Sequence, residues 1–383
     1  MTTETTTSAA TDAPTPDAAG TPAGPGGDGA PDAAAAESAA LSARYLDILN
    51  SSAIALLTSI GHRAGLFEVL SGLPPADSGQ IADAAGLDER YVREWLGGMA
   101  TAGVVHYEPE STRYHLPASH AAVLTRAAGP DNLAQLMQYI PLLGSVEERV
   151  LHCLRHGGGL EYAEYPGFHR IMAEESATVN DAVLVDGILP LVPGLPERLA
   201  AGIDVLDVGC GSGHAVNLMA RAFPASRFTG YDFSAQGIAA ARAEAEAWDV
   251  SNARFEVVDV ASLDDVAEFD LVTAFDAVHD QAHPGRVLAN IRSALRGDGV
   301  FLMVDIDASS NLEDNAAVPW GSYLYAISMF HCMSVSLGLG GDGLGTAWGR
   351  QLAGRMLGEA GFGSVEIVDV EADPFNVYFV ARP

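Results

Sequence analysis

The spacing of apolar residues divides the chain into a helical first half and an alternating second half. From Leu41 to Ile60, large apolar side chains recur at helical spacing, which predicts a helix. Residues 131–200 also have mainly helical spacing, interrupted by Gly and Pro. From Ile203 onward, short β-rich runs alternate with helices, and this pattern predicts a parallel sheet covered on both faces. The predicted fold class is therefore α/β, preceded by an α-helical N-terminal part.

Residues 1–40 follow neither pattern. They consist mainly of Ala, Thr, Pro, Gly and Asp, with almost no large apolar side chain. Such a segment buries too little surface to offset the entropy lost on ordering. We therefore expect a disordered tail, with order beginning near Leu41.

The segment from Ser78 to Pro117 predicts two short helices followed by a β-hairpin. Ser78 and Asp88 are suited to cap the helices, and Gly86 lies in the turn between them. The second helix has one apolar face, and VVHYEPESTRYHL then gives two short strands around a polar turn. Helix, turn, helix, hairpin is the winged-helix pattern, which we assign to residues 41–130.

A winged helix is either a DNA-binding module or a packing and dimerisation module. Between Asp77 and Arg126, four arginines stand against seven acidic residues, and the second helix begins with Asp-Glu. Contacts from basic side chains to phosphates supply much of the affinity for DNA, so this balance argues against nucleic-acid binding. The whole chain has the same bias, with a formal net charge of −30.

A glycine-rich turn follows the first predicted strand of the second half. The sequence IDVLDVGCGSGHAVNLMARAF, residues 203–223, gives an apolar strand, the turn and an Ala-rich helix. Such a turn places backbone N–H groups beside a ligand. The glycines are Gly209, Gly211 and Gly213, while His214 occupies the third small position of the dinucleotide fingerprint.

Three acids at successive strand ends accompany this turn. Asp207 precedes it, in a place that suits the ammonium group of an amino acid better than a pyrophosphate. Asp232 ends RFTGYD, where a carboxylate accepts hydrogen bonds from ribose hydroxyls. Asp259 ends RFEVVD, in a place to hold an adenine amino group while Val260 packs against the ring. Together they predict a site for a nucleoside that bears an amino acid, as S-adenosylmethionine (SAM) does.

At these residues the chain resembles the class I SAM-dependent methyltransferases, over roughly residues 41–383. DVGCGSG matches their glycine motif, and SVEIVDVEADPFNVYFVAR looks like their closing antiparallel strand pair. FHRIM (168–172) is similar to the Phe-x-x-x-Met motif of small-molecule O-methyltransferases, which also carry a winged helix used for dimerisation. FDAVHD and LEDN segments recur in an actinobacterial group described as methyltransferases or transcriptional regulators.

The resemblance implies a seven-stranded Rossmann-like domain over residues 201–383, joined to the winged helix by a helical linker, residues 131–200, that covers the cleft. It also implies a homodimer formed through the winged-helix region, SAM as the cofactor and a small molecule as the substrate. The expected SAM-binding residues are Asp207, Gly209, Gly211, Gly213, Asp232, Phe233, Asp259, Val260, Phe275 and Met172.

The stretch AVHDQAHP, residues 277–284, follows the fourth predicted strand of this domain, at the end of the sheet where such folds bind ligands. In the O-methyltransferase family a His-Asp pair at this position supplies the general base, and His279-Asp280 matches it. An imidazole with a pKa of about 6.5 is suited to take a hydroxyl proton at neutral pH. Glu313 and Asp314 are the candidates for a further acid that orients His279.

A metal site is the rival interpretation of these histidines. Pro284 disfavours a helical conformation at His283, so we interpret His283 as a loop residue and not as a partner of His279. A better second ligand is His331, because two imidazoles with water and a chelating substrate suit Fe(II) or another borderline divalent metal. The primary expectation is a site without a metal.

The segment between the fifth strand and the last helix is apolar and aromatic, and it occupies the place of a substrate-covering insertion. As a group, its side chains indicate a pocket for an apolar or aromatic small molecule. The expected substrate-binding residues are Phe168, Trp320, Tyr325, Met329 and His331.

Composition limits the remaining possibilities. No uninterrupted apolar run of about 18 residues occurs, so we expect no membrane span. The N-terminus has no basic start followed by an apolar block, so we expect no secretory signal. Three scattered cysteines fit free thiols in a reducing cytoplasm.

We therefore predict a cytoplasmic enzyme that transfers a methyl group from SAM to a small hydroxylated molecule, aromatic or similar to a keto acid, with His279 as the base. Two other classes stay open. One is a SAM-binding transcriptional regulator. The other is a SAM-binding enzyme that uses a metal at His279 and His331, either to methylate carbon or to promote another reaction.

Overall fold

The computed structural model describes residues 33–370 and 373–383. Helix α1 begins at Ala33, so the disordered tail predicted for residues 1–40 is wrong for residues 33–40. A run of alanines begins there, and alanine has the highest intrinsic helix propensity. The rest of that predicted tail lies outside the described residues.

The chain divides into two units, Met1–Ser51 and Ser52–Pro383. Helix α1 (Ala33–Arg63) spans this division, and its first part is what the structure describes of the first unit. In the described ranges no single helix is long and apolar enough to cross a membrane, although two bent helix pairs reach that length and composition together.

The second unit begins with the winged helix that the sequence predicted. Its elements are α2 (Leu66–Gly72), α3 (Ser78–Ala85), α4 (Glu89–Thr101), β1 (His106–Glu108) and β2 (Arg113–His115). The predicted apolar face of α4 is buried in one core, in which the rings of Phe67 and Trp95 meet edge to face with their centroids 5.5 Å apart. Its buried members are Val92, Trp95, Leu96 and Met99.

Two of the three predicted turn and cap residues of the winged helix are confirmed. Asp88 caps α4, and Gly86 ends α3 with a left-handed φ of 66°. The cap of α3 is Asp77 and not Ser78. The Asp77 carboxylate accepts the N–H of Gln80, whose side chain accepts the Asp77 N–H in return, so that two otherwise free donors are satisfied together.

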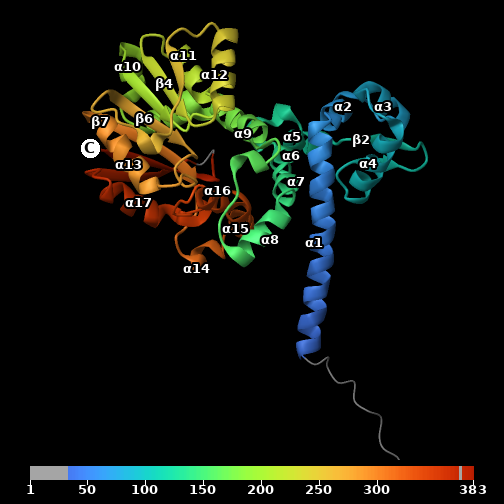
Figure 1. The fold of residues 1–383 in the computed structure, drawn as a ribbon. Helices are drawn as coiled ribbons and strands as arrows, with labels where there is room; N and C mark the ends of the chain where they lie inside the picture. The colour runs from blue at the N-terminus through green and yellow to red at the C-terminus, as the bar shows by residue number, and fades with distance from the viewer. Residues whose placement is uncertain (1–32, 371–372) are drawn as a thin grey trace, which may run out of the picture. The chain divides into compact units, whose positions relative to one another are not determined.

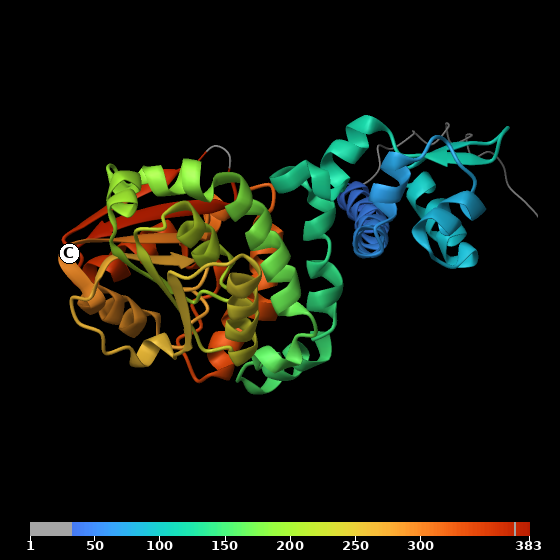
Figure 2. The same cartoon turned by 90° about the horizontal axis from the view of Figure 1, so that it is seen from above.

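The segment between the winged helix and the large sheet is helical, as predicted. It contains α5 (Ala118–Leu124), η1 (Arg126–Asp131), α6 (Leu133–Leu136), α7 (Tyr139–Gly144), α8 (Glu147–His156), the 3₁₀ turn η2 (Tyr162–Glu164), α9 (Phe168–Val183), η3 (Leu184–Ile188), η4 (Leu189–Leu191) and α10 (Leu195–Ala201). In Figure 2, helices α6 to α9, in green, run along one side of the sheet.

The large sheet has seven strands in the order β5-β4-β3-β6-β7-β9-β8. The strands are β3 (Asp204–Val208), β4 (Arg227–Asp232), β5 (Ala253–Val257), β6 (Phe269–Phe275), β7 (Leu295–Ile306), β8 (Ser364–Asp369) and β9 (Asn376–Arg382). Strands β3 to β7 pair in parallel, whereas β9 runs antiparallel to both β7 and β8. The predicted closing strand pair is therefore confirmed at one edge of the sheet.

Helices cover both faces of this sheet, which confirms the predicted layers. Core residues of α10, α11 (His214–Ala222) and α12 (Ala235–Ala247) pack on one face, and those of α13 (Pro284–Ala294) and α17 (Gly349–Glu359) pack on the other. Figure 1 shows the same two groups of helices on opposite sides of the strands. The strands β3 to β7 are parallel, so their carboxyl ends lie at a common edge of the sheet. The strand order reverses between the neighbours β3 and β6, and open α/β sheets bind ligands at such a point.

The predicted insertion lies between β7 and α17. It contains α14 (Leu312–Asn315), α15 (Gly321–Ile327), the π-helical turn η6 (Ser328–Cys332), α16 (Met333–Gly338) and η7 (Thr346–Trp348). Val335 of this insertion is buried in one cluster with residues of α7, α8 and α9. The insertion and the helical linker thus form a common wall beside the sheet.

Candidate active site

The glycine turn after β3 needs glycine at two positions because neighbouring groups come too close for a side chain. Gly209, at φ 73°, would place a Cβ 2.5 Å from the Cβ of Ala277. Gly213, also at φ 73°, would place one 2.4 Å from the Cβ of Ala241. Gly211 has a positive φ too, at 53°, but open space lies beside it. The turn is therefore packed at its two ends and open in its middle, as a ligand cradle requires.

Two predicted acids lie on either side of this turn. Burial raises the pKa of Asp207 to about 7, although Thr273 donates a hydrogen bond of 2.7 Å to its carboxylate. A cationic ligand group beside Asp207 would restore its charged form. Asp232 accepts the N–H of Gly211 at 2.8 Å and the N–H of Ser234 at 2.7 Å, and each carboxylate oxygen keeps a lone pair for a further donor.

The other predicted cofactor residues differ in their exposure. Asp259 is exposed and caps the short turn η5 (Val260–Ser262), in which Val260 is buried. Phe233 is exposed on the loop after β4, and Phe275 is partly buried at the end of β6. Met172 accepts a hydrogen bond at its sulfur from Tyr139 in the wall formed by α7 and α9.

The imidazole of His279 is almost wholly buried between two acids. Its Nδ1 lies 3.1 Å from Oδ1 of Asp305 and 3.5 Å from Oδ1 of Asp276, out of line with an ideal hydrogen bond. Burial is the largest single influence on the pKa of His279 and lowers it, but the surrounding negative charges, Asp305 first and Asp276 among them, together hold the pKa well above its ordinary value. Asp305 is itself fixed, since it accepts the Trp348 indole N–H at 3.1 Å.

The acid beside His279 is therefore Asp305, and the candidates Glu313 and Asp314 are wrong. Both of these side chains are exposed on α14, and Asp314 accepts hydrogen bonds from Ser309 and Asn311 instead. Asp305 is the residue before the last of β7, whose neighbour β6 leads into the His279 loop.

Asp280 contacts the helical linker and not His279. The hydroxyl of Tyr162, from η2, donates a hydrogen bond to its Oδ2. Burial raises the pKa of Asp280, and the positive charge of His279 and the Tyr162 hydroxyl act in the opposite direction. A second tyrosine–acid pair, Tyr139 with Glu175, lies in the same wall.

His331 lies within an aromatic group. Its ring stacks on Phe168 at a centroid distance of 3.8 Å, with the rings of Tyr162 and Tyr165 edge-on at 5.4 and 4.7 Å. Burial, with the nearby charge of His279, lowers the pKa of His331 to about 3, so its imidazole is neutral. Its Nε2 is buried without a hydrogen-bond partner among the described residues. The structure thus brings together two of the predicted substrate residues, Phe168 and His331.

The other three predicted substrate residues lie apart from this aromatic group. Tyr325 and Met329 are each 40% exposed, and the hydroxyl of Tyr325 accepts a hydrogen bond from Asn315. Trp320 packs against Phe375 at a centroid distance of 4.8 Å. The sequence reasoning missed Asp276, Asp305, Tyr162 and the Tyr139–Glu175 pair. Asp276 and Asp305 had a sequence signal, as acids at the ends of the apolar strands β6 and β7.

One set of side chains has the donor types and spacing of a metal site. The ligand atoms of Asp276, His279 and Asp305 lie within 4.8 Å of one another, and over residues 33–370 and 373–383 no other set of three or more does so. One imidazole and two carboxylates fit a borderline or hard divalent ion. His331 is not in this set, so the predicted pair of His279 and His331 is not the arrangement that the ligand atoms favour.

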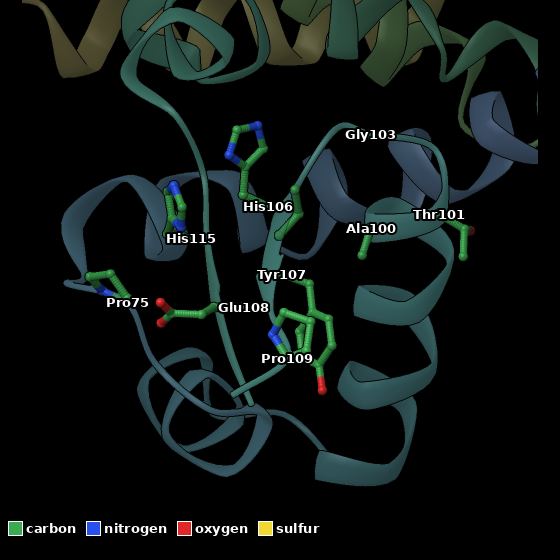
Figure 3. A pocket seen from close by; sticks show the side chains of 10 residues that line it. Pro75, Ala100, Thr101, Gly103, His106, Tyr107, Glu108, Pro109 and His115 are labelled. Carbon is green, nitrogen blue, oxygen red and sulfur yellow. The ribbon is translucent and has the colours of Figure 1, made fainter. Parts of the chain in front are cut away.

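A pocket of 780 Å³ lies in the winged helix, and its lining includes none of these groups. Figure 3 shows its lining, with His106 and His115 side by side on the hairpin strands and Ala100 and Thr101 at the end of α4. None of the residues predicted for the active site lines it.

Comparisons with known families agree with this architecture. A model described as an Rv2258c-like winged HTH domain matches residues 52–126, and a methyltransferase domain matches residues 199–347. The chain therefore joins a winged helix-turn-helix domain to a methyltransferase domain of the class I, SAM-dependent fold. This confirms the predicted fold class, and the match over residues 199–347 agrees with the predicted class of enzyme.

Particular proteins of this class share the fold over most of the chain. The mitomycin 7-O-methyltransferase MmcR has a TM-score of 0.68 at 18% identity, over 91% of this chain and 99% of its own. Human N-acetylserotonin methyltransferase in complex with SAM has a TM-score of 0.64 at 15% identity, over 89% of this chain and 97% of its own. Likeness at these identities establishes the fold.

One relative matches at higher sequence identity but over a shorter part of the chain. Trans-aconitate 2-methyltransferase of Deinococcus radiodurans is 36% identical over 115 residues, which is 30% of this chain. The match spans 41% of that relative's length.

Proposed function

We propose that this chain transfers the methyl group of SAM to a hydroxyl of a small molecule, with His279 as the general base. The observation that carries the proposal is the buried imidazole of His279, whose Nδ1 faces Asp305 at 3.1 Å. A proton on Nδ1, directed at the acids, leaves the Nε2 lone pair to take a proton. That chemistry suits the loop after β6, at the edge where open α/β folds bind ligands.

When bound, SAM supplies a sulfonium methyl group for in-line displacement, and the residues of the chain hold the reacting groups. Asp207 would hold the amino-acid end of SAM and Asp232 its ribose hydroxyls, and the open space beside Gly211 would give room for the ligand. His279 Nε2 would take the proton of the acceptor hydroxyl. The products are the methyl ether and S-adenosylhomocysteine, with the proton left on the imidazole. Positioning of two partners supplies much of the acceleration in such a reaction.

The walls favour a planar, apolar acceptor. The rings of Phe168 and Tyr165 lie nearest to the ring of His331. The ring centroids of Tyr323 and Tyr139 lie 6.5 Å apart. Aromatic side chains stack well on planar ligands and leave few polar groups to be satisfied. We therefore propose an aromatic acceptor with a hydroxyl, and a keto acid in its enol form as the runner-up.

A metal-assisted reaction is the second candidate function. It is supported by three buried atoms that lack hydrogen-bond partners in the described ranges: His279 Nδ1, Asp305 Oδ2 and Asp276 Oδ1. Asp276, His279 and Asp305 would hold the ion, and a divalent ion would supply Lewis acidity toward a chelating acceptor. Metal analysis of protein purified without chelators decides this case, because one metal per chain supports it and a metal-free active enzyme excludes it.

We also propose a homodimer formed through the N-terminal region. Helix α1 exposes Leu41, Tyr45, Leu46 and Leu49, each between 54% and 66%. A row of large exposed apolar side chains typically marks an interface. Light scattering should give twice the chain mass, and the double substitution Tyr45→Glu, Leu49→Glu should give the monomer. A wild-type monomer at micromolar concentration would contradict this proposal.

The winged helix is proposed as a scaffold, and a regulator of transcription is the alternative. The acid-rich face argues against DNA, and a salt-dependent gel shift on DNA from upstream of the gene would reverse that view. A cytoplasmic location is proposed from the three free cysteines, because free thiols persist in a reducing compartment. Cell fractionation checks it.

The enzymatic proposal is tested with SAM that carries an isotopic label in its methyl group. Purified protein is incubated with labelled SAM and a metabolite extract from the source organism, and products are separated by mass spectrometry. We expect one labelled product that retains the label on an ether oxygen. Label on carbon with a metal requirement would replace the proposal by the second candidate.

A further inference from the structure

We propose that Tyr162 is a positioning residue that holds the loop of His279 and Asp280 in place and joins it to the cofactor site. This inference rests on the proposed function, since it assigns a role in the same reaction. One side chain contacts both parts of the site. Its hydroxyl donates to Asp280, directly after the proposed base, and its ring lies 5.2 Å from that of Phe233, directly after Asp232.

The segment that carries Tyr162 is anchored on both sides. The N–H of Leu160 donates to the Ser334 carbonyl at 3.0 Å, and the Arg149 guanidinium donates to Glu164 at 2.6 Å. The first contact depends on Gly159, because a Cβ there would lie 2.0 Å from the Ser334 oxygen. The Tyr162 hydroxyl is therefore presented at a fixed place, which a positioning residue requires.

The loop of His279 and Asp280, which receives this hydrogen bond, is also held by α16, the helix that contains Ser334. Ser336 Oγ donates to the Gln281 carbonyl at 2.8 Å, and the N–H of Asp342 donates to the Ala282 carbonyl at 2.8 Å. Ser334 and Ser336 are both in α16, so one helix supports the Tyr162 segment and the catalytic loop. Tyr162 adds a direct link between the two segments, since its hydroxyl donates to Asp280 while its ring contacts Phe233 beside the cofactor site.

The hydrogen bond from the Tyr162 hydroxyl to Asp280 lies on the side of the proposed base, so its loss should affect turnover more than cofactor binding. In Tyr162→Phe the ring keeps its contact with Phe233, but Asp280 loses its donor and the loop loses one anchor. A shift of about 1 Å in a catalytic group lowers turnover by as much as about 100-fold. We therefore expect kcat to fall 10- to 100-fold with little change in KM for SAM. In Tyr162→Ala the ring contact is also lost, so KM for SAM should rise as well.

The experiment compares wild type, Tyr162→Phe, Tyr162→Ala and a matched control, Tyr378→Phe. The control also removes a tyrosine hydroxyl from an aspartate, since Tyr378 of β9 donates to Asp373 at 2.5 Å. Hydrogen exchange of the amides in residues 277–283 is measured with and without S-adenosylhomocysteine, followed by kcat and KM. Exchange should be at least 10-fold faster in Tyr162→Phe than in wild type and the control, in both conditions.

Wild-type exchange and wild-type kcat in Tyr162→Phe would overturn the inference. Because exchange is measured without turnover, its outcome is separate from that of the proposed function, which fails if wild type transfers no methyl group. Should Tyr162→Phe not fold, Asp280→Asn weakens the same hydrogen bond from the other side and carries the same expectation for exchange and for the division between kcat and KM.

Discussion

Nδ1 of His279 lies 3.1 Å from Oδ1 of Asp305, and both side chains are almost wholly buried. The pair forms because β6 and β7 are neighbouring parallel strands, so that the loop after one meets the end of the other. Trp348 donates to the same carboxylate oxygen and holds it toward the imidazole. In the proposed reaction the neutral imidazole carries its proton on Nδ1, toward the two acids, so that Nε2 is free to take a proton.

Removing the charge of Asp305 should lower turnover without loss of cofactor binding. In Asp305→Asn the amide no longer favours the required tautomer, and kcat should fall by roughly 10²- to 10⁴-fold, as in other His–Asp pairs. The affinity for S-adenosylhomocysteine, measured by calorimetry, should stay within about twofold. Asp307→Asn, which removes an acid paired with Arg350 at 2.6 Å, is the matched control and should keep wild-type kcat. Equal activity of both variants would exclude Asp305 from the mechanism.

The rate should depend on pH through His279. Its pKa is held above the ordinary value of 6.5, chiefly by Asp305 against the effect of burial, and the base is active only when it is deprotonated. We therefore expect kcat/KM to rise with pH, with a midpoint above 6.5. Asp305→Asn removes the charge that raises this pKa, so the residual activity should reach its midpoint at lower pH. A profile that is flat between about pH 6 and 9 would count against His279 as the base.

The glycine turn offers a series in which only packing differs. Gly209, Gly211 and Gly213 all have positive φ, but a Cβ meets close neighbours only at Gly209 and Gly213. Gly211→Ala should lower the free energy of unfolding by about 1 kcal/mol, from backbone strain alone. Gly209→Ala and Gly213→Ala should cost about 1–3 kcal/mol more through overpacking and should abolish cofactor binding. Urea unfolding measures the series, and equal losses at all three positions would contradict this account.

Local patterns in the sequence predicted most of the fold and the cofactor half of the site. Asp88, Gly86 and the apolar face of α4 act within a few residues, and Asp207 and Asp232 stand beside their own strand ends. The sequence did not distinguish Asp77 from Ser78 as the cap of α3, because the two residues are adjacent and both side chains suit that role.

The acceptor half of the site was less predictable, because it depends on which segments meet in space. Asp305 lies beside His279 because β6 and β7 are neighbouring strands, whereas Glu313, within the LEDN segment, is exposed to solvent. Tyr162 reaches Asp280 from a segment 118 residues earlier in the chain. Trp320, Tyr325 and Met329 share the composition of a pocket lining, but composition does not tell which side of a helix faces the pocket.

His214 should contribute to stability in a pH-dependent way. It contacts Glu244 at 2.7 Å and Asp181 at 3.0 Å, and these acids raise its pKa although burial acts in the opposite direction. A raised pKa in the folded state means that the contribution is complete below about pH 6.5, the unfolded value, and is lost as pH rises through the folded value. His214→Gln should therefore cost about 1–3 kcal/mol at pH 6 and less at pH 9. Thermal unfolding at both pH values checks this, and an equal loss at both would contradict it.

Substitution of His279 tests the central claim most directly. His279→Ala and the control His283→Ala, which changes a half-exposed loop histidine four residues on, are compared with wild type in calorimetry and in transfer of labelled methyl groups. We expect all three proteins to bind S-adenosylhomocysteine with similar affinity, and His279→Ala alone to lose turnover by at least about 10²-fold. Wild-type turnover in His279→Ala would contradict the account.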